Sequence, residues 1–111
     1  MPDQEIVTSI RSDNIDTELV EDSLMLVACI LDIQYLETIE EIKSVAVYFG
    51  SYIKVCYALV DMFPYFEKQF SITGTPTFLL IKHGYILDTL LGKNSAQDLV
   101  AWIKTYVEHL F

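Results

Sequence analysis

The stretch that decides the fold is SITGTPTFLLIKHG, residues 71–84, in which a proline precedes an apolar run that ends at a turn. Thr77–Lys82 and residues 85–90 are both rich in side chains that favour strands. Between them stand His83 and Gly84, which resemble an Asn-Gly turn in which glycine supplies a positive φ. This stretch predicts a β-hairpin with a proline at its entrance.

Upstream of the hairpin, two apolar runs enclose a helical pattern. Leu24–Ile30 is continuously apolar, as expected of a strand covered on both faces, and residues 52–60 read the same way. Residues 36–49 have helical spacing and end at Gly50. Strands joined by a helix form a βαβ unit, so we expect them to pair in parallel. The buried stripe expected on the helix is Leu36, Ile39, Ile42, Val45, Ala46 and Phe49.

Shorter elements complete the chain. Residues 6–10 predict a first strand, and residues 12–14 offer capping oxygens to a short helix through Val20. Asp61 and Pro64 predict another short helix, which continues to Phe70. The last helix begins near Ser95, with Asp98 completing a box of capping side chains. Its apolar stripe is Leu99, Trp102, Ile103, Tyr106, Val107 and Leu110. We expect one α/β domain over residues 1–111.

The charge is unevenly distributed along the chain. The formal net charge is −9, and residues 1–41 hold eleven of the sixteen acidic residues against one base, Arg11. Nucleic-acid binding needs a basic surface, so we expect no nucleic-acid partner, and an anionic membrane is disfavoured for the same reason. The acidic residues keep an apolar protein soluble or attract a basic partner. No basic leader with an apolar run and no bilayer-length segment is present, so a cytoplasmic protein is expected.

The hairpin and its approach resemble the thioredoxin signature. The shared features are Gly74, one residue, Pro76, Thr77, an apolar strand and a turn that ends in Gly84. Asp61, Pro64, Gly92 and the last helix also stand where thioredoxins have their counterparts, and the likeness is specific from about residue 52 onward.

The resemblance implies a thioredoxin-like fold, a mixed central sheet with a parallel βαβ half, an antiparallel ββα half and helices on both faces. It also implies a cis peptide bond before Pro76. The main-chain edge at Thr75 would then be able to pair with an extended peptide.

The catalytic half of such an enzyme is missing. Thioredoxins carry a Cys-x-x-Cys motif between the buried strand and the next helix, and counting back from Gly50 that place is filled by Asp32, Ile33, Gln34 and Tyr35. Without two thiols a dithiol–disulfide cycle cannot run. Asp32 is interpreted either as a helix N-cap or as an anionic recognition point in place of the thiolate.

Few other residues offer chemistry. Cys29 is either a buried strand residue or the single cysteine of a shifted motif, and Cys56 is a core cysteine. The histidines and cysteines have no metal-ligand spacing, so we expect no metal and no cofactor. Four aromatic residues could either line a binding surface or pack in the core: Tyr35, Phe63, Tyr65 and Phe66.

The function expected from the sequence is that of a redox-inactive thioredoxin-fold protein. It would act as an adaptor or a folding and assembly factor, and bind another protein or an extended peptide through residues 32–35, Thr75 and Pro76. Two alternatives remain open at this stage. One is a single-cysteine thiol oxidoreductase that uses Cys29, and the other is a structural or dimerisation module that forms a homodimer.

Overall fold

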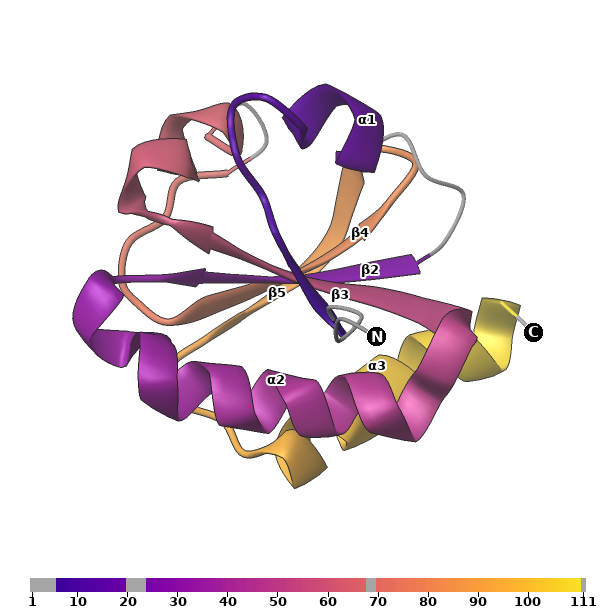
Figure 1. Cartoon of the computed structure of the whole chain (residues 1–111). Coiled ribbons are helices and arrows are strands. Elements are labelled where there is room, and N and C mark those ends of the chain that lie inside the picture. Colours follow the sequence, from indigo (N-terminus) through magenta and orange to yellow (C-terminus); the bar gives the residue numbers. More distant parts are fainter. Residues whose placement is uncertain (1–5, 20–23, 68–69, 111) are drawn as a thin grey trace, which may run out of the picture.

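The computed structural model describes residues 6–19, 24–67 and 70–110, which form a mixed α/β structure (Figure 1). The elements alternate between helices and strands until the two last strands, which follow each other directly. In chain order they are β1 (Val7–Ser9), α1 (Ile15–Leu19), β2 (Leu24–Ile30), the 3-10 helix η1 (Asp32–Gln34), α2 (Tyr35–Phe49), η2 (Gly50–Tyr52), β3 (Ile53–Leu59), η3 (Val60–Tyr65), β4 (Thr77–Lys82), β5 (Tyr85–Leu91) and α3 (Ala96–Leu110).

The five strands form one mixed sheet in the order β1-β3-β2-β4-β5. β3 runs parallel to both β1 and β2, and β4 runs antiparallel to both β2 and β5. The predicted α/β class, the parallel pairing of β2 with β3 and the terminal hairpin are therefore confirmed.

Helical segments cover both faces of this sheet. α2 and α3 lie on one face, while α1 and η3 lie on the other (Figure 1). β2 is the middle strand, and all seven of its side chains are buried. They alternate between the two cores, because successive side chains of a strand point to opposite faces. Leu26 and Ala28 face α2 and α3, whereas Val27 and Cys29 face η3 and α1.

The apolar stripe of α2 is confirmed except at its first position. Ile39, Ile42, Val45, Ala46 and Phe49 are buried, but Leu36 is 78% exposed. At 3.6 residues per turn, Leu36 lies about 60° around the helix from Ile39. Thr38, on the other side of Ile39, takes the buried position in the first turn instead.

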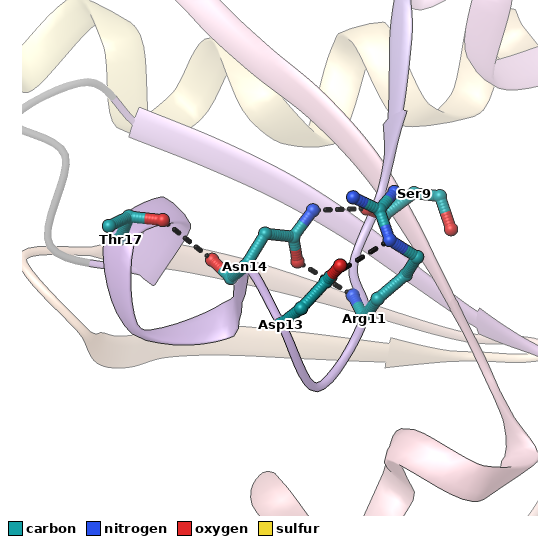
Figure 2. A network of polar contacts seen from close by, with 5 residues as sticks. All are labelled: Ser9, Arg11, Asp13, Asn14 and Thr17. Atoms are coloured by element: carbon teal, nitrogen blue, oxygen red, sulfur yellow. Dashed lines mark hydrogen bonds and ion pairs between the residues drawn. The ribbon is translucent and has the colours of Figure 1, made fainter.

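The link from β1 to α1 is held by one amide side chain rather than by a helix cap (Figure 2). Asn14 Oδ1 accepts a hydrogen bond from the backbone N–H of Arg11 at 2.7 Å, and Asn14 Nδ2 donates to the carbonyl oxygen of Ser9 at 2.9 Å. Arg11 also pairs with Asp13. Asn14, one of the residues expected to cap the helix, therefore forms its side-chain hydrogen bonds with preceding residues instead. The predicted continuation of this helix to Val20 lies outside the described residues.

The segment after β3 differs from the prediction. Instead of a helix from Pro64 to Phe70, the chain forms the 3-10 helix η3, which starts at Val60 and contains Pro64. Phe66 ends this helix and lies buried in the core. Because this helix starts at Val60, Pro64 falls inside it, and the missing N–H of proline removes a hydrogen bond that a longer α-helix would need. Residues 68–69 of the predicted helix lie outside the described residues.

The hairpin turn is formed as its sequence predicts. His83 and Gly84 have φ angles of 53° and 81°, the left-handed conformations that a two-residue hairpin turn requires at both positions. The pairing of β4 with β5 contains one irregularity between Leu80 and Ile81.

Two side chains fix α3 at its start and along its length. Ser95 Oγ accepts a hydrogen bond from the backbone N–H of Asp98, which confirms Ser95 as the cap, but among the described residues the Asp98 carboxylate does not return a bond to Ser95. Further along, Asp88 Oδ2 in β5 accepts hydrogen bonds from Trp102 Nε1 and from the hydroxyl of Tyr106. Leu99 and Ile103 are fully buried, whereas the side chain of Leu110 lies outside the described residues.

Among the described residues, no helix is both long enough and apolar enough to cross a lipid bilayer.

Asp88 should make the stability of this protein depend on pH. Burial acts to raise the pKa of Asp88, but hydrogen bonds from Tyr106, Trp102 and the N–H of Thr89 outweigh it and lower the pKa below the usual value. Because the folded pKa is depressed, the stabilisation is present above the unfolded value of about 3.9 and is lost as the pH falls through the folded value. We expect Asp88→Asn to cost about 1 kcal/mol at pH 7 and less at pH 3, as measured by urea unfolding.

Asp32→Asn is the matched control, since it removes the same charge from an exposed side chain without a hydrogen bond to a described residue. An equal loss at pH 7 and pH 3 in Asp88→Asn would contradict a role for the charge.

Candidate functional site

The residues predicted to form the site meet at one end of the sheet. β2 and β3 run parallel and finish beside each other, with Ile30 opposite Leu59. β4 runs the other way and begins there, with Thr77 opposite Cys29. The segments after β2 and before β4 therefore leave the sheet at the same end, at the left of Figure 1, which we call the loop end.

Residues 32–35 form a compact turn before α2. Leu31 and Gln34 exchange two hydrogen bonds, from the N–H of Leu31 to Gln34 Oε1 and from the N–H of Gln34 to the carbonyl of Leu31, both at 2.9 Å. Gln34 is the residue that closes this turn, so the interpretation of Asp32 as the N-cap of α2 is wrong. Asp32 and Ile33 project into solvent, and Ile33 is 89% exposed.

Tyr35 is directed toward β3 rather than toward β4. Its ring meets that of Tyr57 edge to face, with 5.2 Å between the centroids. β3 and β4 lie on opposite sides of β2. Tyr35 is thus half-buried and packs against the core beneath α2, and its ring is directed away from the strand that follows Thr75.

Thr75 lies in a segment whose neighbours are pinned but whose own main chain is not. The Thr75–Pro76 peptide bond is cis. The carbonyl of Pro76 accepts a hydrogen bond from the N–H of Gly92 at 2.8 Å, and the hydroxyl of Thr77 donates to the carbonyl of Gly74 at 2.6 Å. Within the described part of the chain, no hydrogen bond involves Thr75. The residues on both sides of Thr75 are therefore held by hydrogen bonds, whereas its own N–H and C=O have no hydrogen-bond partner among the described residues.

Apolar side chains are exposed around this end of the sheet. Leu31, Ile33 and Leu36 belong to the turn and the start of α2, and Val60 directly follows β3. Leu91 lies opposite Thr77 at the end of β5. We call these five residues the loop-end apolar set. Of the remaining predicted aromatic residues, Tyr65 is half exposed, whereas Phe66 is buried and Phe63 packs against the core beside it.

Cys29 is deeply buried in the middle strand. Its side chain lies in the core formed with Val27, Met62 and Phe66, and it has no exposed surface. Burial raises the pKa of the Cys29 thiol to about 12, so the thiol is protonated at neutral pH. Cys56 is also buried, and no disulfide joins the two. The structure supports the interpretation of Cys29 as a buried strand residue.

A pocket of about 130 Å³ opens beside Pro76, and the sequence did not reveal it. It lies between the first turns of α2, the start of β4 and the segment between β5 and α3. We call it the Pro76 pocket, and its lining residues are Glu37, Thr38, Glu41, Pro76, Phe78, Lys93, Asn94 and Ser95.

Charged groups dominate the polar part of the Pro76 pocket. Lys93 Nζ lies 2.8 Å from Glu37 Oε1 in an exposed ion pair, and the hydrogen bond and the charge of Glu37 raise the pKa of Lys93. Glu41 Oε1 accepts a hydrogen bond from the backbone N–H of Ala96 at 2.6 Å. Glu41 therefore caps α3 from another helix. The sequence could not signal this bond, since its partners are 55 residues apart.

Comparison with known proteins gives no family to which this arrangement could be assigned. No protein-family model matches the chain, and no curated protein matches its sequence.

The burial of Cys29 leads to a direct expectation for its reactivity. In a Cys56→Ser background, we expect iodoacetamide to leave Cys29 unmodified between pH 7 and pH 9 in the folded protein and to react only as denaturant unfolds it. The reason is that the thiol is both inaccessible and protonated. Mass spectrometry after timed quenching measures the rate.

The matched control places a cysteine at an exposed position of the same loop end, Ile33→Cys in a Cys29→Ala, Cys56→Ser background. It should react at the rate of a small thiol. Alkylation of Cys29 in the folded protein that is faster at pH 7 than that of an ordinary thiol would contradict this expectation and support a single-cysteine thiol oxidoreductase.

Proposed function

We propose that this chain has a thioredoxin-like fold without redox activity, and that it binds an extended segment of another protein at the loop end. The role would be that of an adaptor or a folding and assembly factor. The observation that carries the proposal is the main chain of Thr75. It is fixed on both sides, has no hydrogen bond to a described residue, and lies at the same end of the sheet as the loop-end apolar set.

Three features support the fold assignment. The first is the order β1-β3-β2-β4-β5, in which β4 alone runs in the direction opposite to the other four strands. The second is the cis peptide bond before Pro76 at the entrance of β4. The third is the pair of helices α2 and α3 packed on one face, with α1 and η3 on the other. The mixture of parallel and antiparallel pairs, the cis bond and the helices on both faces agree with what the resemblance implies.

Binding by strand addition requires both main-chain and side-chain contacts. The N–H and C=O of Thr75 can form two hydrogen bonds with an extended segment, as an added strand does at a sheet edge. Two such bonds are too few for appreciable affinity, since each contributes only about 0.5–1.5 kcal/mol net. The exposed side chains of Leu31, Ile33 and Val60 add apolar area that a partner can cover.

The chemistry available at the loop end does not favour an enzyme. Residues 32–35 contain no thiol. Cys29 is fully buried in the core, and burial raises the pKa of its thiol. A dithiol–disulfide cycle needs two accessible sulfur atoms. Two reduced cysteines suit a reducing compartment, and the proposal places the protein in the cytoplasm.

The fold assignment can be tested by restoring the missing dithiol. In a Cys29→Ala, Cys56→Ser background, Asp32→Cys with Tyr35→Cys should form an intramolecular disulfide. The double variant should then catalyse the reduction of insulin by dithiothreitol, because position 32 lies just before α2, where a thiolate is favoured. The rate is followed by turbidity. Asp32→Cys alone is the control and should be inactive; a double variant that forms no disulfide would count against the assignment.

The binding proposal can be tested without knowing the natural partner. Peptides of seven residues selected from an unbiased displayed library should shift the backbone amide resonances of Leu31 and Thr75. Ile33→Asp should weaken the selected peptides about tenfold or more, because a charge replaces an apolar contact. Val47→Asp, at an exposed apolar position on the outer face of α2, is the matched control. Peptides that shift amides elsewhere, or equal losses in both variants, would argue against this surface.

A further inference from the structure

The Pro76 pocket carries an excess of negative charge close to the proposed binding edge. Two carboxylates, Glu37 and Glu41, line it together with a single cation, Lys93. Pro76 is itself a wall of the pocket and is the residue next to Thr75. A segment that pairs with Thr75 would therefore lie close to this pocket.

Inside the pocket, one largely buried side chain carries a hydroxyl that no described residue bonds. Thr38 is 5% exposed and lines the pocket, and its hydroxyl has no hydrogen bond to any described residue. A hydroxyl has one donor and two acceptor sites to offer to a group that enters the pocket. Thr38 lies between the two acidic residues in sequence and shares this side of α2 with both, so a donor that enters the pocket can reach a hydroxyl and a carboxylate together.

The unused hydrogen-bond acceptor sites of Glu41 also favour a ligand that carries N–H donors. Its Oε1 atom holds the N–H of Ala96, and a carboxylate has about four lone-pair sites. A ligand with several N–H donors can use the rest without breaking the cap of α3. The volume of about 130 Å³ is near the roughly 150 Å³ of a cavity that admits benzene, so a planar guanidinium or an ammonium group has room.

We propose that the Pro76 pocket binds the cationic end of an arginine or lysine side chain from the extended segment that pairs with Thr75. This inference rests on the proposed function and adds the chemistry of the partner. In the free protein, Lys93 stands in for that cation at Glu37. On binding, the incoming side chain takes over Glu37, and Lys93 moves into solvent, to which it is already largely exposed.

A metal ion is a weaker candidate for the same place. Across residues 6–19, 24–67 and 70–110, no group of three or more histidine, cysteine, aspartate or glutamate side chains could hold a metal ion. The Pro76 pocket offers two carboxylates, with a lysine ammonium group among them.

The inference is tested first with small probes, so that it does not depend on peptide binding. The n-butylguanidinium ion and its neutral analogue n-butylurea are titrated against the whole protein, and the amide shifts of Thr38, Glu41 and Ala96 are followed by NMR. We expect n-butylguanidinium to bind about tenfold more tightly, and 1 M NaCl to reduce the difference. Equal affinities of the two probes would overturn the proposal.

Two variants separate a binding role from a structural one. Glu41→Gln keeps an oxygen for the N–H of Ala96 and should abolish the preference for n-butylguanidinium, whereas Glu40→Gln, the same change at an exposed neighbour outside the lining, should not. Lys93→Gln should strengthen n-butylguanidinium binding several-fold, because it removes the competing cation. Unchanged or weaker binding in Lys93→Gln would overturn the proposal even if Glu41→Gln fails to fold.

A pair of peptides then tests whether one segment binds both the Pro76 pocket and the main chain of Thr75. Acetyl-Val-Thr-Arg-Thr-Val-amide should shift the amides of Thr75 and Thr38 together and bind about tenfold more tightly than the same peptide with norleucine in place of arginine. If both peptides shift Thr75 with equal affinity, the pocket inference fails and the proposed function stands. If neither peptide shifts Thr75 but n-butylguanidinium binds at Thr38, the pocket stands and the proposed edge fails.

Discussion

The structure depends on the burial of β2 on both faces. A strand whose seven side chains are all excluded from water needs a strand on each side and a layer of helices above and below. β3 and β4 supply the flanking strands, and α2 with α3 and α1 with η3 supply the two layers. The rest of the chain can be understood as the covering of this one segment. Its side chains alternate between the two cores, so a charged residue at any position would be buried on one face or the other.

The same constraint locates the surface that is open to other molecules. Because β2 is covered along its whole length, this strand can present groups to other molecules only where it ends, and β3 ends and β4 begins at that point as well. The turn at residues 31–34, Val60 and Thr75 are brought together by strand direction alone. Burial also explains why Cys29 is a poor nucleophile: it lies within the strand, where desolvation raises the pKa of its thiol. Positions 32 and 33, in the turn before α2, are exposed, and a thiol there would be accessible.

The Pro76 pocket arises where the two helices of one face approach the start of β4. Glu41 reaches from α2 to the first N–H of α3, and Glu37 reaches to Lys93 just before α3. These two contacts link α2 to the start of α3 beside Pro76. The two glutamates that make them give the pocket its excess of negative charge. Within β5, Asp88 performs a comparable task, since it accepts hydrogen bonds from Trp102 and Tyr106 of α3. α3 is thus held by carboxylates at its start and along its length, with Leu99 and Ile103 buried between them.

The sequence by itself determined the strands, the hairpin and the direction of pairing, because apolar period, turn residues and capping residues are local signals. The run Leu24–Ile30, the turn at His83 and Gly84, and the cap at Ser95 all have the form that their residues predict. Local signals failed where two neighbouring residues could take the same position or a side chain had more than one local partner. Asn14 bonded backwards to β1, Gln34 rather than Asp32 closed the turn before α2, and Leu36 was left exposed while Thr38 was buried.

Only the tertiary structure decided the composition of the candidate site. Asp32, Ile33 and Thr75 were predicted from their places in the sequence, and they do lie at one end of the sheet. Tyr35 was predicted with them but packs on Tyr57 toward β3. The pocket residues Thr38, Glu41 and Lys93 could not be predicted, because their proximity to Pro76 comes from how α2 and α3 pack across the sheet. Sequence specifies which residues form each element, whereas the packing of elements specifies which side chains meet.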